Sequence, residues 1–316
     1  MERISTASAY SGVLNNLLNA ETQQTNISNQ ISSEEVSTDL KGYASKAENL
    51  TALQSVQAQV TGYIANAQVT SEQLTTQDTA LNQLSSASTA ASQAVTTALA
   101  AGSGSTLIQS LGAAFQNAVQ GLNASFNGSY VFSGGNSNTP PVNVTSLSAL
   151  GAVTPANLPT VFTNSSHVTT TQVTPSTSIQ TGFLANALGT PLFGVLQTIS
   201  AYDQNPATGP FGNPLTDAQQ SFLQGQLSSL TAATTGLNTA TAQNGQAQAE
   251  LTSATTDLTN QQTSLTGLIG DITNVNLAQA SSQPSQAQLA IQASSRVFSA
   301  LQSSSLLGFL QSTGTA

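Results

Sequence analysis

The chain of 316 residues contains only 4 Lys and Arg against 13 Asp and Glu, so its formal net charge is -9. Binding a nucleic-acid backbone requires clustered basic side chains, and these do not cluster, which argues against a nucleic-acid partner. Without Cys, the chain can form neither a disulfide nor a thiolate metal site. No apolar run approaches the ~18 residues of a membrane helix, so we expect no membrane insertion. Ser, Thr and Asn interrupt the N-terminal stretch, so we expect export, if any, to proceed without a cleaved signal peptide.

Residues 4–31 are the first predicted helix. Their apolar positions step by three and four residues, which is the spacing of a helix that packs against another helix. The positions on this seam are Tyr10, Val13, Leu17, Ala20, Gln24, Ile27 and Ile31. Residues 32–49 are rich in charge and include Gly42, and we expect them to form an exposed bend between helices.

A second helix is predicted from residue 50 to about residue 100. Its seam repeats every seven residues, which predicts a helical rod. The seam consists of Leu53, Val60, Ala67, Leu74, Leu81, Ser88 and Val95, with Ser71 and Asp78 among the alternate positions. Glycines at 102 and 104 should end the rod, and residues 106–126 should form a further helix. Asn127-Gly128 then predicts a tight turn before an extended stretch.

Residues 133–215 have a different character. They contain several prolines and β-branched runs such as residues 167–174, which predict short strands and turns with edges blunted by proline. A short helix is expected to begin at Leu192 and to end near Tyr202. We therefore expect a small β-rich insert.

The longest pattern in the chain begins at residue 216. Thr216 and Gln219 match a capping box, and seam positions, which include polar residues such as Thr234 and Asn244 beside the leucines, then alternate steps of four and three from Leu223 to Ile272. Because this rod and the first one lie on opposite sides of the insert and have similar lengths, an antiparallel pairing follows, and the two termini meet. For residues 53–99 and 223–272, an intramolecular core explains the pattern.

The predicted fold is mainly α with a small β-rich insert: an elongated antiparallel helical rod or coiled-coil bundle, with the insert at its distal end. Three domains are expected. Residues 1–49 and 273–316 would form an inner assembly domain of terminal helices. Residues 50–132 and 216–272 would form the rod, and residues 133–215 the outer insert.

The last predicted helix covers residues 283–310, with Pro284 at its start or at a kink. Its apolar groups form one broad stripe, which we expect to pack first on the N-terminal seam of the same chain and then on neighbouring copies. Apolar stripes at both extreme termini commonly mark intersubunit packing. The predicted interface residues are Tyr10, Val13, Leu17, Ala20, Ile27 and Ile31 of the first helix, and Leu289, Ala293, Val297, Phe298, Leu301, Leu306, Leu307, Phe309 and Leu310 of the last.

Candidate residues for chemistry are few. His167 is the single histidine and has no carboxylate beside it in the sequence, so a structural role is favoured over acid/base catalysis. The acidic residues between 34 and 39 lack the ligand spacing of a Ca²⁺ loop, and Gly134-Gly135 lacks the context of a phosphate loop. We therefore predict no catalytic, cofactor-binding or metal-binding residue, no cofactor and no enzymatic activity.

Several segments resemble the bacterial flagellin family. These are residues 3–6 (RIST), 30–33 (QISS), 287–294 (AQLAIQAS) and 305–310 (SLLGFL). Within that family, residues 129–141 (SYVFSGGNSNTPP) are similar to the segment that ends the N-terminal helical part of hook-associated proteins at the hook–filament junction.

The resemblance implies a structural subunit of the bacterial flagellum, located outside the cell and exported by the flagellar type III apparatus. The partners that it implies are copies of the same chain, a neighbouring hook-associated protein, flagellin and an export chaperone. The terminal helices would form the inner coiled-coil part of the assembly. Two alternatives are a filament flagellin and a surface-exposed flagellin homologue whose insert binds a glycan.

Overall fold

The structure is a computed structural model that describes the backbone of residues 2–313 and the side chains of residues 8, 10–301 and 303. It is 73% helical, which confirms the mainly α prediction. The chain divides into two compact units, residues 1–59 with 261–316 and residues 60–260. The two longest helices, α2 (Ala47–Ala101) and α6 (Asp217–Thr273), each contribute to both units.

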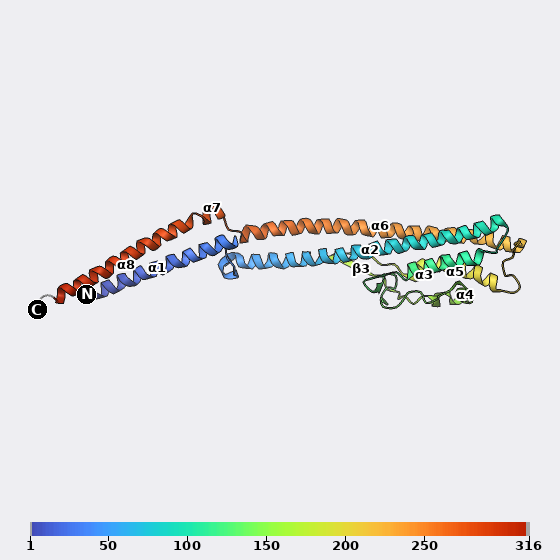
Figure 1. Ribbon diagram of the computed structural model, residues 1–316, viewed down its shortest axis with the longest axis horizontal. Coiled ribbons are helices and arrows are strands. Elements are labelled where there is room, and N and C mark those ends of the chain that lie inside the picture. Colours follow the sequence, from blue (N-terminus) through green and yellow to red (C-terminus); the bar gives the residue numbers. More distant parts are fainter. Residues whose placement is uncertain (1, 314–316) are drawn as a thin grey trace. The chain divides into compact units, whose positions relative to one another are not determined.

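In the unit of residues 60–260, α2 and α6 run side by side in opposite directions (Figure 1). The Ser88 and Thr234 hydroxyls lie 2.8 Å apart, and the Ser85 hydroxyl donates to Asn238 Oδ1 at 2.8 Å, which gives the antiparallel register. Every seventh residue of α2 from Val60 to Val95 is buried, as the heptads predicted. On α6, the buried seam of this unit consists of Leu223, Leu230, Leu237, Asn244, Leu251 and Leu258.

The start of α6 forms the predicted capping box. Gln219 N–H donates to the Thr216 hydroxyl at 3.2 Å, and Thr216 N–H donates to Gln219 Oε1 at 3.2 Å. This reciprocal pair satisfies two backbone donors that the first turn of a helix leaves without partners. The sequence pattern therefore located the start of α6 correctly.

One difference concerns the width of the buried face of α2. A second row spaced by seven residues is also buried: Thr70, Gln77, Leu84, Ala91 and Ala98. Ser71, which the two-helix pattern placed at the seam, is exposed. A two-helix seam is narrow, whereas α2 also packs against elements between α2 and α6, so its buried stripe is broader.

The segment between α2 and α6 contains both helices and short strands. They comprise α3 (Leu107–Leu122), β1 (Ser125–Phe126), β2 (Ser129–Tyr130), α4 (Leu147–Gly151), the 3-10 helix η2 (Pro155–Val161), β3 (Thr170–Thr174), β4 (Thr177–Gln180) and α5 (Ala185–Gln204). Asn127 and Gly128 form the predicted turn between β1 and β2, with φ of 49° and 79°. The strands form two antiparallel pairs, β1–β2 and β3–β4.

Helix α5 begins earlier than its sequence predicted. It starts at Ala185 instead of Leu192 and contains Pro191. Ala185 and Leu188 are both buried, at 0% and 8% exposure. The burial of this first turn offsets the hydrogen bond that the proline ring removes, so the helix runs through Pro191 without a break.

The main core of this unit lies between α2, α3, α5 and α6. Phe115 of α3 and Phe193 of α5 are fully buried, with ring centroids 5.2 Å apart. Phe162 extends the aromatic group, with its centroid 5.5 Å from that of Phe193. Large aromatic side chains thus join α5 and Phe162 to α3, and each buries more apolar area than an aliphatic residue.

The other unit contains α1 (Glu2–Ser33), the 3-10 helix η1 (Leu40–Lys46), α7 (Leu277–Ala280), α8 (Gln283–Thr313) and the adjoining ends of α2 and α6. The segment that follows α1 and the segment at the end of α6 pair by backbone hydrogen bonds. Val36 N–H donates to the Thr273 carbonyl at 2.7 Å, and Val275 N–H donates to the Glu34 carbonyl at 2.9 Å. The pairing ties the segment after α1 to the segment after α6.

Replacing Ala44 with Gly is expected to stabilise this unit by about 1 kcal/mol, because Ala44 has a φ of 46° that residues with a Cβ rarely adopt. The free energy of unfolding in urea would measure the gain. Ala47→Gly is the matched control, since Ala47 has a helical φ of -60°. This second substitution should destabilise by roughly 0.5–1 kcal/mol. If both substitutions change the free energy of unfolding by the same amount, the backbone at Ala44 is not strained.

Candidate assembly surface

Helices α1 and α8 pack along each other in the single chain (Figure 1). The Tyr10 and Phe298 rings lie with centroids 4.7 Å apart and planes at 56°, while Ala20 and Ile27 are buried at 7% and 3% exposure. Val13, Leu17 and Gln24 are half-buried between them. The N-terminal seam predicted from the sequence therefore faces a helix, as expected from its spacing.

The seam changes at the end of α1. Ile31, the last predicted position, is exposed at 36%, and Gln30 is half-buried in its place. Gln30 Nε2 donates to the Val36 carbonyl at 2.8 Å, so the last turn of α1 is held by the following connection. Ile31 thus remains available to another chain.

Helix α8 presents a different face to α1 than the predicted one. The side chains on its inner face are Ala287, Ile291, Ser294, Phe298 and Leu301, which alternate steps of four and three. Leu289 and Val297 are exposed at 66% and 49%, and Ala293 is exposed as well. The prediction that Leu289 and Val297 pack on the N-terminal helix of the same chain is therefore wrong. The apolar residues of α8 are spread over more than half of the helix circumference. The face that packs on α1 is the one with Ala287 and Phe298, and the face with Leu289 and Val297 stays exposed.

Both helices consequently carry exposed apolar side chains that their own chain does not cover. We call these the outer stripes: Leu14 and Leu18 on α1, exposed at 43% and 50%, and Leu289, Ala293 and Val297 on α8. Fully burying a Leu or Val side chain stabilises by about 1.5–3 kcal/mol, so covering each half-exposed one contributes roughly 1 kcal/mol.

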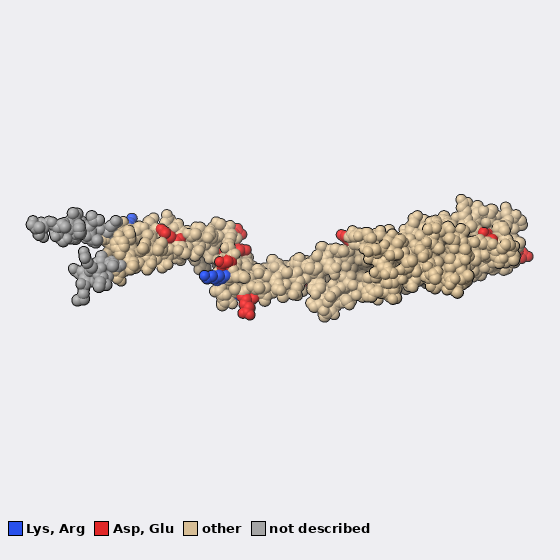
Figure 2. Space-filling view, turned by 90° about the horizontal axis from the view of Figure 1, so that it is seen from below, with Lys and Arg blue, Asp and Glu red and all other residues tan. Residues whose placement is uncertain are grey.

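Few charges interrupt these stripes. Among the described side chains of α1 and α8, only Glu21 and Arg296 are of acidic or basic type. Figure 2 shows that most of the viewed surface carries neither basic nor acidic side chains. Contacts on this surface must therefore come from apolar packing and from the amides and hydroxyls of Gln, Asn, Ser and Thr. Four predicted interface residues (Leu306, Leu307, Phe309, Leu310) have side chains outside the described residues.

The same unit has a second exposed apolar region, a groove of about 500 Å³ between the start of α2 and the end of α6. Leu53, Leu268 and Ile272 line it, and Lys46 and Asp271 border it. Leu268 is 49% exposed. The unit therefore exposes apolar side chains beyond the α1–α8 pair.

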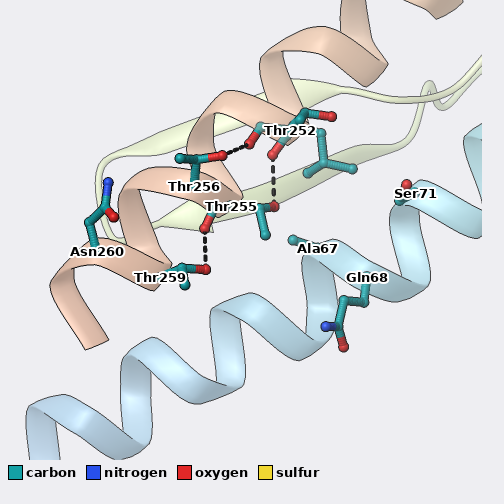
Figure 3. Close-up of a pocket in the computed structure, with 9 residues that line it drawn as sticks. Ala67, Gln68, Ser71, Thr252, Thr255, Thr256, Thr259 and Asn260 are labelled. Carbon is teal, nitrogen blue, oxygen red and sulfur yellow. Dashed lines mark hydrogen bonds between the residues drawn. The ribbon is translucent and has the colours of Figure 1, made fainter. Parts of the chain in front are cut away.

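A groove of about 330 Å³ between α2 and α6 has a floor of Ala67 and Leu251 and walls of polar side chains (Figure 3). Four threonines of α6 line it, and each hydroxyl donates to the carbonyl four residues earlier. The residues that line this groove include no titratable group. It offers neither an acid nor a base, so no catalytic constellation forms there.

The remaining candidates for chemistry stay isolated. His167 is exposed in the segment before β3, where its backbone N–H donates to the Ser165 hydroxyl at 3.2 Å. Across the described residues, no group of three or more His, Cys, Asp or Glu could hold a metal ion. Among the helices that the structure describes, none has an apolar stretch sufficient to cross a bilayer.

Comparison with known proteins gives three findings. The model of the bacterial flagellin C-terminal helical region matches residues 227–310. No curated protein sequence matches the chain. Among solved structures, a flagellar hook-associated protein of Vibrio parahaemolyticus is similar with a TM-score of 0.59 and 16% identity, over 75% of this chain and 99% of that one. FlgL of Bacillus cereus is similar with a TM-score of 0.50 and 17% identity, over 70% and 99% of the two chains.

These findings bear out the resemblance that the terminal segments suggested. At such identities the structural likeness speaks for the fold, and the match over α6 and α8 speaks for the family of that region. Residues 227–310 thus match the model of the bacterial flagellin C-terminal helical region, on a chain whose fold is similar to that of flagellar hook-associated proteins.

Proposed function

We propose that this chain is a structural subunit of the bacterial flagellum at the hook–filament junction, the place of hook-associated protein 3, and that it assembles through α1 and α8. The observation that carries the proposal is the pair of outer stripes, exposed on helices that already pack together, in a chain with a flagellin C-terminal helical region. An isolated protein gains nothing from apolar side chains placed in this way. A ring or tube of copies would bury them.

In this assembly the inner seam joins α1 to α8 within each chain, and the outer stripes contact neighbouring copies. The terminal helices, residues 1–49 and 273–316, act as the assembly domain. Residues 50–132 and 216–272 act as the rod, and residues 133–215 face outward. The interface residues proposed for contact with other chains are Leu14, Leu18, Ile31, Leu289, Ala293 and Val297, with Leu306, Leu307, Phe309 and Leu310 at the C-terminal end.

The partners follow from the position. Because the charge of the chain is low, neighbouring subunits would be recognised by shape and apolar complementarity rather than by ion pairs. Copies of this chain, the adjacent hook-associated protein and flagellin are the proposed neighbours, and an export chaperone would cover the exposed stripes before assembly. The protein would then lie outside the cell, without nucleic-acid or membrane partners.

Immunogold electron microscopy of intact flagella tests the position. An antibody against residues 133–215 is expected to label one site per flagellum, at the point where hook and filament meet. A strain lacking the chain is the control for antibody specificity. Label along the whole filament would identify a filament flagellin, and label on the cell body alone would contradict a flagellar role.

A further inference from the structure

Two fully buried polar side chains face the same cross-section of the α2–α6 pair. Gln77 of α2 and Asn244 of α6 are each 0% exposed. Asn244 Nδ2 donates to the Leu74 carbonyl at 3.0 Å. Because helix carbonyls point toward the C-terminus, the Leu74 oxygen lies beside the turn that carries Gln77. Gln77 and Asn244 therefore occupy one layer, which we call the polar layer.

This layer is poorly satisfied. Both polar atoms of the Gln77 side chain and Asn244 Oδ1 have no hydrogen-bond partner among the described residues. Elsewhere in the same pair of helices, buried polar groups are matched, as in the 2.8 Å contact of Ser88 with Thr234. Burying a polar atom without a partner removes it from water and is unfavourable.

The polar layer also separates the two hydrophobic cores of residues 60–260. The larger core reaches Ala80 on α2 and Ala240 on α6. The smaller core begins at Leu74 and Ala247. Between these limits, the buried side chains on the two helices are Gln77 and Asn244 alone, within the described part of the chain. No apolar contact therefore carries the packing across this layer.

The smaller core depends on the β3–β4 hairpin. It consists of Ala67, Leu74, Val173, Ile179, Ala247 and Leu251, with Ala254 packed against it. Asn66 Nδ2 donates to the Gln172 carbonyl at 3.3 Å, and the Thr70 and Thr171 hydroxyls lie 3.3 Å apart. A few side chains and two contacts thus hold the hairpin to α2, far less than the aromatic core that anchors α5.

We propose that the polar layer is a joint that divides residues 60–260 into two cooperative parts. The part that contains the hairpin and the adjoining segments of α2 and α6 opens while the larger core stays folded. Proteins open locally in contiguous units, and their limits fall where few buried apolar contacts connect neighbours. Because of the polar layer, the part with the hairpin opens at a lower free-energy cost than it would if the apolar seam between α2 and α6 were continuous.

Hydrogen exchange of the full-length chain, followed by mass spectrometry at increasing urea concentrations, tests the proposal. In the wild-type chain, amides of residues 63–74, 170–180 and 247–258 are expected to exchange together. They should exchange at least about 10-fold faster than amides of residues 81–98 and 223–240. Equal rates in the two sets, or hairpin exchange independent of the helices, would overturn the joint.

A variant with apolar side chains in the layer tests its cause. In Gln77→Leu with Asn244→Leu, protection of the hairpin part should rise at least about 10-fold toward that of the larger core. The single variant Gln77→Met removes two of the three unpaired atoms at little change in volume, and it carries the test if the double variant does not fold.

The matched control replaces a satisfied buried pair. Ser88→Ala with Thr234→Val removes both partners of one hydrogen bond inside the larger core, which is close to neutral when both are replaced together. This control should leave the difference in amide exchange rate between the hairpin part and the larger core unchanged. If the polar-layer variants leave hairpin protection at its wild-type value, the layer is not the boundary.

Discussion

A chain in which Leu289 and Val297 are both replaced by Asp is expected to fold but to be absent from flagella. Both side chains are exposed, at 66% and 49%, so the substitutions remove little packing from the single chain. In an assembly that buries the outer stripe, each change loses roughly 1 kcal/mol of apolar burial. Each also buries a carboxylate at a cost of several kcal/mol. Association should weaken by at least about 100-fold, since each 1.4 kcal/mol is a factor of ten.

The measurement is the fraction of flagella that carry immunogold label in cells where the variant replaces the wild-type chain. Circular dichroism and thermal unfolding of the purified variant report its fold. Gln292→Asp with Ser295→Asp is the control, because it adds the same two charges at exposed polar positions of the same helix. If the variant with Asp at 289 and 297 is labelled normally, the outer stripe is not part of the interface between subunits. Loss of helical content would instead show that these residues support the fold.

Replacing Phe193 with Ala is expected to destabilise the unit of residues 60–260 by about 3–5 kcal/mol, the usual range for a fully buried Phe. Phe193 is 0% exposed and contacts the rings of Phe115 and Phe162, so its removal leaves a cavity bounded by two large side chains. The midpoint of thermal unfolding should fall by roughly 6–20 °C for a unit of this size.

Val69→Ala is the control for this change. Val69 lies on α2 in the same unit and is 52% exposed, so its truncation should alter stability by less than about 0.5 kcal/mol. Calorimetry of both variants provides the comparison. A loss of less than about 1 kcal/mol for Phe193→Ala would mean that the core collapses around the missing ring, and the aromatic anchor of the insert would then be weaker than its burial indicates.

The local signals of the sequence predicted most elements well. The capping box at Thr216 and the Asn127-Gly128 turn depend on contacts within a few residues, and the heptads of α2 and α6 are a regular spacing along the chain, so all of them are visible without knowledge of the fold. The prediction for α5 began at Leu192 instead of Ala185, because the apolar run there is a local signal while the burial of Ala185 and Leu188 is tertiary. The extra buried row of α2, including Gln77, was missed for the same reason.

The candidate assembly surface shows the limit of pattern analysis. On α1 the seam from Tyr10 to Ile27 followed from spacing alone, because its positions alternate steps of three and four residues. On α8 apolar residues occupy several faces, so spacing does not distinguish the side that packs on α1 from the side that remains open. Phe298 belongs to the inner face because Tyr10 lies opposite it at 4.7 Å, a relation across the chain that no local pattern contains.

The sequence by itself determined the helical rods, their antiparallel pairing, the apolar character of both termini and the absence of any motif for catalysis. Periodicity and capping are short-range properties, and the chain carries them in its residue order. The tertiary structure alone decided which face of α8 stays exposed and where the polar layer interrupts the core. Both depend on which residues lie opposite each other after folding, and burial is a property of that arrangement rather than of any single segment.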